Sequence, residues 1–81
     1  MSRARDVVEV VARALADRPD AVRVTESVHR GQTLVELFMA QGDLGRVIGR
    51  QGRTAMALRT LVSATAEIEG SKATLEFRDE A

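Results

Sequence analysis

The sequence predicts an α+β domain with the element order α-β-β-α-α-β, in which three helices pack on one face of a three-stranded sheet. Two observations predict this class. Three segments place apolar residues at the spacing of an amphipathic helix, and three others alternate apolar and polar residues as a half-buried strand does. The chain of 81 residues fits a single domain, residues 1–81, with a thin core of two layers.

The first expected element is an amphipathic helix over residues 3–17. Apolar residues recur at positions i, i+4, i+7 and i+8, and Arg5, Glu9 and Arg13 lie outside this stripe. Pro19 ends the helix, because proline has no amide hydrogen and clashes with the preceding turn. The stripe expected to face the core consists of Val7, Val11, Ala14 and Leu15.

A β-hairpin is expected over residues 21–40, with Gly31 in the turn between its strands. In the first strand, Val22, Val24 and Val28 alternate with polar residues. The second strand has two apolar faces, which is unusual for a strand with one face in solvent. Its core face is expected to contain Val35, Leu37 and Met39, and its opposite face Leu34, Glu36 and Phe38.

Two helices separated by a glycine turn are expected over residues 43–66. Asp43 can cap the first of them, because its carboxylate can accept hydrogen bonds from the free amides of the first turn. Gly49 ends this helix and Gly52 opens the next one. The core face of the longer helix is expected to contain Ala55, Leu58, Val62 and Ala66. The last strand, residues 72–78, alternates in the same way and directs to one side Ala73, Leu75 and Phe77.

Charge is unevenly distributed along a chain whose net charge is zero. The 12 basic and 12 acidic residues cancel, which argues against a protein that binds polyanions through its overall field. Between Leu44 and Ala66, however, no residue is acidic, and the basic residues there are Arg46, Arg50, Arg53 and Arg59. This stretch is either a local anion-binding surface or a solvated helix face.

The composition argues against several classes of site. Cysteine is absent, which excludes disulfides and thiolate chemistry and favours a reducing compartment. The one histidine, His29, falls at the hairpin turn, where we expect a surface residue, and there is no nucleotide-binding glycine motif. No apolar run is long enough to span a membrane, and the N-terminus is unlike a secretion signal. The sequence therefore predicts a cytoplasmic protein that is not an enzyme and uses no cofactor or metal.

The stretch GRVIGRQGRTA suggests an anion-binding turn. A helix that stops at Gly49 and restarts at Gly52 leaves backbone amides at the positive end of the second helix, where an anion can bind. Glycine at both ends leaves room for a phosphate close to the backbone. The polar side chains expected around that phosphate are those of Arg46, Arg50, Gln51 and Arg53.

An apolar surface is expected beside this turn. We name it the apolar floor, and its expected members are Val47, Ile48, Ala55 and Leu58. A nucleic-acid strand needs a polar surface for its phosphates and a less polar one for its bases, and both are expected here. Because tyrosine and tryptophan are absent, aliphatic packing is expected to hold the bases, and Phe38 and Phe77 are expected to be structural.

The whole chain resembles a KH domain. VIGRQG followed by RTAMALRTLV is similar to the KH signature, with residues 49–52 as the GXXG loop. The element order is that of the type II, bacterial arrangement, and GRVIGRQGRTA is similar to the central stretch of KhpA, a family of small bacterial RNA-binding proteins. The resemblance implies that single-stranded RNA binds at the GXXG loop and the apolar floor. The chain departs from many KH domains at Ala55, where isoleucine is common, and at Met56, where we expect a basic or polar residue.

The same resemblance implies partners and a cellular role. KhpA-like proteins self-associate and pair with KhpB, a larger KH-containing protein, to bind cellular RNA, and they influence cell-wall synthesis and cell shape. A homodimer and a KhpB-type partner are therefore expected, with no membrane association. The implied role is that of an RNA chaperone or a regulator that acts after transcription.

Three other interpretations of these residues stay open. The glycine turn can be a purely structural corner between two helices, or part of a DNA-binding helix-turn-helix, although the flanking strands argue against the latter. The chain can also be a protein-interaction module, because the strand face with Leu34 and Phe38 is more apolar than a free sheet surface. The interpretations differ in the residues they need, which are the glycine turn for RNA and the apolar face for protein.

Overall fold

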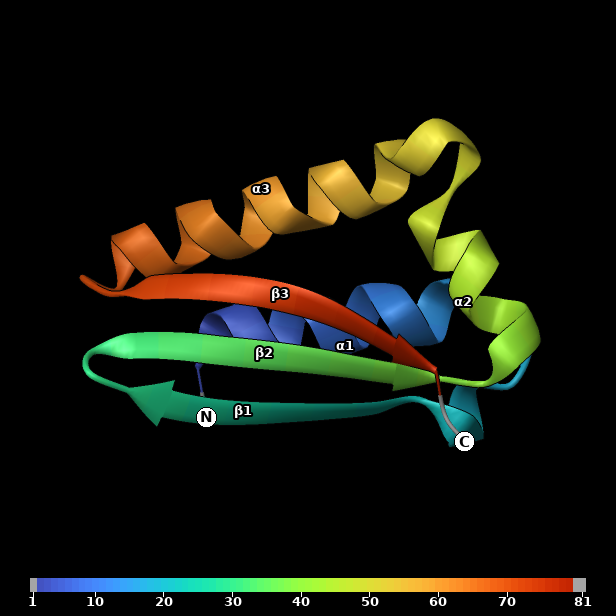
Figure 1. Ribbon diagram of the computed structural model, residues 1–81, viewed down its shortest axis with the longest axis horizontal. Coiled ribbons are helices and arrows are strands. Elements are labelled where there is room, and N and C mark those ends of the chain that lie inside the picture. The colour runs from blue at the N-terminus through green and yellow to red at the C-terminus, as the bar shows by residue number, and fades with distance from the viewer. Residues whose placement is uncertain (1, 80–81) are drawn as a thin grey trace.

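The computed structural model describes residues 2–79 and has the order α-β-β-α-α-β (Figure 1). Its elements are α1 (Arg3–Leu15), the 3₁₀ helix η1 (Pro19–Ala21), β1 (Arg23–His29), β2 (Gln32–Met39), α2 (Gln41–Ile48), the 3₁₀ helix η2 (Arg50–Gly52), α3 (Arg53–Ile68) and β3 (Lys72–Asp79). Compared with the sequence-based expectation, α1 ends two residues earlier and α2 begins two residues earlier.

β2 is the central strand of a mixed sheet with the order β1-β2-β3. It pairs antiparallel with β1 through the hairpin, whose turn has positive φ at Arg30 and Gly31, and parallel with β3. α1 and α3 lie side by side and pack against the same sheet (Figure 1). The predicted α+β fold, with three helices and a three-stranded sheet, is therefore confirmed. The β1–β2 turn and the α2–α3 junction lie at opposite ends of the molecule (Figure 1).

The core lies between the sheet and the helices. In β2, Val35, Leu37 and Met39 are fully buried, as the alternation predicted. The predicted face of α3 is also confirmed, since none of its four members is more than 5% exposed; these are Ala55, Leu58, Val62 and Ala66. Each large apolar side chain buried in this way stabilises the fold by about 1.5–3 kcal/mol relative to full exposure.

α1 packs through a different face from the one its spacing predicted. Ala4, Val8 and Ala12 are at most 1% exposed, whereas Leu15 of the predicted stripe is 40% exposed. Of the other members of the predicted stripe, Ala14 is exposed, and Val7 and Val11 are only partly buried. The valine-rich run offers two neighbouring apolar stripes, and the stripe with small alanines faces the core, where a helix can approach its neighbours closely.

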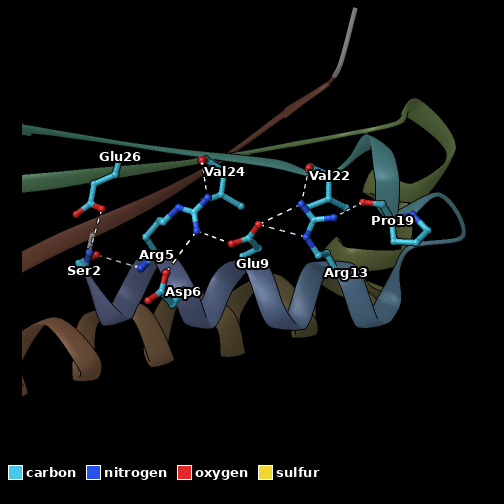
Figure 2. A network of polar contacts seen from close by, with 9 residues as sticks. All are labelled: Ser2, Arg5, Asp6, Glu9, Arg13, Pro19, Val22, Val24 and Glu26. Carbon is cyan, nitrogen blue, oxygen red and sulfur yellow. Dashed lines mark hydrogen bonds and ion pairs between the residues drawn. The ribbon is translucent and has the colours of Figure 1, made fainter.

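With this face of α1 toward the core, two arginines of α1 contact the backbone of β1 and of the segment just before it (Figure 2). Arg5 Nη2 donates to the carbonyl oxygen of Val24 at 3.3 Å, and Arg13 Nη2 donates to that of Val22 at 3.4 Å. Glu9 lies between the two arginines and accepts from both. Hydrogen bonds from Arg5 and then from Arg13 lower the pKa of Glu9. The arginines therefore satisfy one carbonyl in the first part of β1 and one just before the strand, and they fix α1 beside β1.

Asp43 does not cap α2, contrary to the prediction. The helix begins at Gln41, its N-cap position is Ala40, and no side chain caps it. Asp43 is 4% exposed, and its carboxylate accepts from the backbone amides of Asp17 at 3.2 Å and Arg18 at 2.9 Å. Asp43 was expected to accept hydrogen bonds from the amides of its own helix. It accepts instead from amides of the segment that follows α1, because this segment passes beside the first turn of α2.

Val28 was predicted to alternate with Val22 and Val24 on a half-buried face, but it is 67% exposed. The backbone amide of Ser2, just before α1, donates to Glu26 at 3.1 Å. α1, the helix beside β1, therefore begins level with Glu26, and Val28 lies beyond the start of this helix. The period of the strand was correct, but the sequence did not show how far along β1 the helix layer extends.

Candidate nucleic-acid interface

Residues 49–52, here called the glycine loop, join α2 to α3 in a tight turn. Gly49 has φ/ψ of 77°/173° and Gly52 has 71°/16°, so both take conformations that favour glycine. Between them, Gln51 has a φ of 56°, and the amide of Gly52 donates to the carbonyl of Gly49 at 3.1 Å. The predicted break, with Gly49 ending one helix and Gly52 opening the next, is confirmed.

The two glycines differ in what surrounds them. A Cβ on Gly49 would lie 2.5 Å from the Thr54 Oγ1 atom, so both this contact and the backbone angle disfavour any residue with a side chain at this position. A Cβ on Gly52 would meet no atom within 4 Å. Gly49 therefore fixes the turn, whereas Gly52 keeps the space beside the backbone open.

The start of α3 adjoins this open space. No side chain caps the helix at Gly52, and α3 extends over 16 residues to Ile68. The amide of Arg53 donates to the carbonyl of Arg50, and the other amides of the first turn have no side-chain acceptor at the positive end of the helix dipole. This is the backbone arrangement that binds phosphate in many proteins, provided that cationic side chains lie nearby.

Three of the predicted polar side chains meet at the loop. Arg50, Gln51 and Arg53 are all exposed, and Arg53 Nη2 donates to Gln51 Oε1 at 3.1 Å. Within the described residues 2–79, neither arginine has a carboxylate partner. Two positive charges thus remain uncompensated beside the uncapped start of α3.

Arg46 is placed differently from the expectation of a free flanking cation. Its Nη2 atom lies 2.9 Å from Asp17 Oδ2, in an ion pair whose side chains are 58% and 64% exposed. Such an exposed pair contributes about 0–1 kcal/mol. A phosphate can compete for Arg46, but Asp17 neutralises part of its charge in the free protein.

The apolar floor is not the exposed surface that the sequence predicted. Val47, Ala55 and Leu58 are 0%, 5% and 2% exposed and belong to the core, while Ile48 alone of the four is partly exposed. Periodicity shows which residues share a helix face but not how closely the sheet covers that face, which explains the error. The buried members support the loop from below, and Ile48 and the 65% exposed Met56 present apolar surface beside it.

Comparison with known proteins decides the family. The family model for "KhpA/KhpB, KH domain" matches residues 5–77. The RNA-binding protein KhpA of Treponema pallidum is 45% identical over 74 residues, which cover 91% of this chain and 92% of that protein. The chain belongs to the KhpA/KhpB family of KH domains. KhpA of Aquifex aeolicus is 43% identical over 77 residues, covering 95% of this chain and 98% of the relative, and KhpA of Chlamydia trachomatis is 33% identical over 76 residues, covering 94% and 97%.

Membership of the KhpA/KhpB family agrees with two expectations from the sequence. The relatives are named RNA-binding proteins, and the family is not enzymatic, as the absence of a catalytic motif predicted. Within residues 2–79, no helix is long and apolar enough to cross a membrane.

The open face of the sheet of this KH domain carries the residues expected to contact protein. Leu34 and Phe38 are partly buried on central strand β2, and the Arg23 guanidinium lies 4.4 Å from the centre of the Phe38 ring. This stacking covers part of the apolar patch, as expected for a Phe38 with a structural role.

Sequence reasoning did not assign Arg59 to a site, although it counted its charge. The side chain projects from α3 toward β3, where Nε donates to the carbonyl of Leu75 at 3.3 Å and the guanidinium lies 5.0 Å from the centre of the Phe77 ring. Arg59 lies two helical turns from the glycine loop along the same helix. Its contacts with β3 become visible only once the position of that strand is known.

Proposed function

We propose that this KH domain binds single-stranded RNA at the glycine loop. The observation that carries the proposal is the uncapped start of α3 next to Arg50 and Arg53, two exposed arginines without carboxylate partners in the described chain. The names of the relatives, which are RNA-binding proteins, support the same function.

The proposed contacts divide by chemistry. Phosphate oxygens accept from the first-turn amides of α3 that follow Arg53 and from the guanidinium groups of Arg50 and Arg53, while Arg46 contributes when it leaves Asp17. Gln51 donates from its amide at the tip of the loop. Bases contact Ile48, and the core residues Val47, Ala55 and Leu58 hold the loop and Ile48 in position from below. A single strand is preferred over a duplex, because paired bases cannot reach this surface.

The test replaces both tip residues by aspartate. Arg50→Asp/Gln51→Asp places two negative charges where a phosphate approaches, so binding of a short uridine-rich RNA should fall below detection while the thermal midpoint stays near that of the wild type. The matched control is Arg30→Asp/Gln32→Asp, which makes the same change of charge at exposed positions at the opposite end of the molecule.

The control variant should retain most of its affinity. RNA binding that persists undiminished in a folded loop variant would make the glycine loop a structural corner. An equal loss in both variants would show that only net charge matters.

The finer role that we propose is post-transcriptional regulation or RNA chaperone activity in the cytoplasm, with a KhpB-type partner. The family model, which covers both KhpA and KhpB, supports the choice of partner.

A second proposed function is protein pairing, with itself or with that partner, through Leu34 and Phe38 on the open sheet face. Leu34→Asp should abolish pairing in sedimentation or co-purification and leave RNA affinity unchanged. Arg50→Asp/Gln51→Asp should abolish RNA binding and leave pairing unchanged.

A further inference from the structure

The segment between α1 and β1 is fastened to α2 close to the proposed RNA site. The buried carboxylate of Asp43 in α2 accepts from the amide of Asp17 at 3.2 Å and from that of Arg18 at 2.9 Å. These two hydrogen bonds hold the backbone of Asp17 beside α2. The side chain of Asp17 is itself exposed, so its carboxylate is available to the side chains of that helix.

Arg46 of α2 pairs with this carboxylate. Its Nη2 atom lies 2.9 Å from Asp17 Oδ2. Arg46 precedes Gly49 by three residues, about 4.5 Å along the helix, so its charge lies within one helical turn of the glycine loop. Arg50 and Arg53 have no carboxylate partner within residues 2–79. In the free protein, Asp17 therefore neutralises one of the three arginines around the loop and leaves the other two uncompensated.

The pair between Arg46 and Asp17 can separate at little cost. The two side chains are 58% and 64% exposed, so water can replace each partner. Beside Arg46, Gly45 is also exposed, and a Cβ on it would meet no atom within 4 Å. The neighbouring surface of α2 therefore leaves room for the guanidinium of Arg46 to move away from Asp17.

We infer that Asp17 competes with an RNA phosphate for Arg46 and thereby limits the affinity of the RNA site. A carboxylate and a phosphate both offer two oxygens to a guanidinium, so they compete for the same donors. Asp17 holds Arg46 while no RNA is bound, and the phosphate must displace it. The inference rests on the proposed RNA-binding function and adds an affinity-limiting residue to it.

The experiment titrates an octamer of uridine against Asp17→Asn, which removes the charge and keeps the shape of the side chain. RNA affinity should rise about threefold at low salt, within the range expected for the loss of one exposed ion pair. The gain should shrink as the salt concentration rises, because salt screens exposed charges. The amide of residue 17 still donates to Asp43, so the thermal midpoint should stay near that of the wild type.

Asp20→Asn is the matched control. It removes the same charge three residues further along the same segment, where Asp20 is exposed and has no ion pair in the described chain. It acts on RNA only through the long-range field, and it should therefore raise the affinity less than Asp17→Asn does.

A double-mutant cycle separates competition from net charge. Arg46→Ala should weaken RNA binding, and Asp17→Asn in the Arg46→Ala background should give no more gain than Asp20→Asn does. An equal gain from Asp17→Asn with and without Arg46 would overturn the inference, since Asp17 would then act by net charge alone. An unchanged or lowered affinity in the single variant Asp17→Asn would overturn it as well.

The two proposals fail in distinguishable ways. If Arg50→Asp/Gln51→Asp abolishes RNA binding and Asp17→Asn binds as the wild type does, the loop proposal stands and the competition by Asp17 is wrong. If the loop variant binds as the wild type does, the proposed function itself is wrong, whatever the effect of Asp17→Asn.

Discussion

The arginines of α1 and those of the glycine loop differ in how their donors are used. Arg5 and Arg13 donate to Glu9 and to backbone carbonyls in β1 or in the segment just before it, so these donors are used within the fold (Figure 2). Arg50 and Arg53 are exposed and have no carboxylate partner in the described chain. The first pair serves stability, and the second is available for a ligand.

This difference shows that a run of basic residues does not by itself define a binding surface. In the sequence both pairs are arginines in or next to predicted helices, and both are compatible with the pattern of a solvated helix face. What separates them is the distribution of acceptors, since the stretch around the loop lacks acidic residues whereas α1 contains Glu9 between its arginines.

The largest effect is expected at the turn that holds the loop arginines in place. Gly49→Ala should lower the free energy of unfolding by about 3 kcal/mol, because the backbone angle is unfavourable and the new methyl group meets Thr54. Gly52→Ala should cost about 1 kcal/mol, from the left-handed angle alone. Urea unfolding measures both values, and equal losses would contradict the assignment of Gly49 as the fixed point of the turn.

The next effect concerns an arginine that is occupied within the fold. Arg5→Ala should lower the free energy of unfolding by about 2 kcal/mol, because the Val24 carbonyl and Glu9 lose a charged partner whose side chain is 14% exposed. RNA affinity should not change. Arg3→Ala removes a 74% exposed arginine from the same helix and should cost less than about 0.5 kcal/mol. A reduced RNA affinity in Arg5→Ala would show that the α1 arginines also bind RNA, so they would not differ from the loop arginines in function.

The reciprocal prediction concerns a loop arginine. Arg50→Ala should reduce RNA affinity by about tenfold, since one charge-assisted phosphate contact is lost, and leave the thermal midpoint nearly unchanged. The plot of log affinity against log salt should become shallower by about 0.7, the contribution of one neutralised phosphate on a single strand. Arg30→Ala, an exposed arginine at the far end of the molecule, is the control. Binding by the wild type that does not depend on salt would refute the phosphate contact.

The sequence alone supplied the fold, the α3 core face and the glycine turn, because each depends on local periodicity or on glycine. It did not supply the rotation of α1, the acceptor role of Asp43 or the burial of Val47, Ala55 and Leu58. These depend on how closely two elements approach each other. The contact of Arg59 with β3 was not predicted for the same reason, since Leu75 is distant from Arg59 in the chain but adjacent to it in space.

The smallest effect tests the acidic partner of the α1 arginines through pH. Hydrogen bonds from Arg5 and Arg13 lower the pKa of Glu9 in the folded state, so the ionised form stabilises the fold. Glu9→Gln should therefore lower the thermal midpoint at pH 7. This difference should stay constant while the pH remains above the ordinary glutamate value of 4.5 and shrink as the pH falls below it, because the wild-type carboxylate then becomes protonated as well.

Glu67→Gln removes an exposed carboxylate of α3 that has no ion pair within residues 2–79, and it should leave the midpoint near that of the wild type throughout the titration. A Glu9→Gln difference that grows as the pH falls would have the wrong sign for a lowered pKa. It would show that Glu9 does not hold the two arginines against β1. The α1 arginines would then differ from the loop arginines only in position, and their carbonyl contacts alone would have to explain the effect of Arg5→Ala.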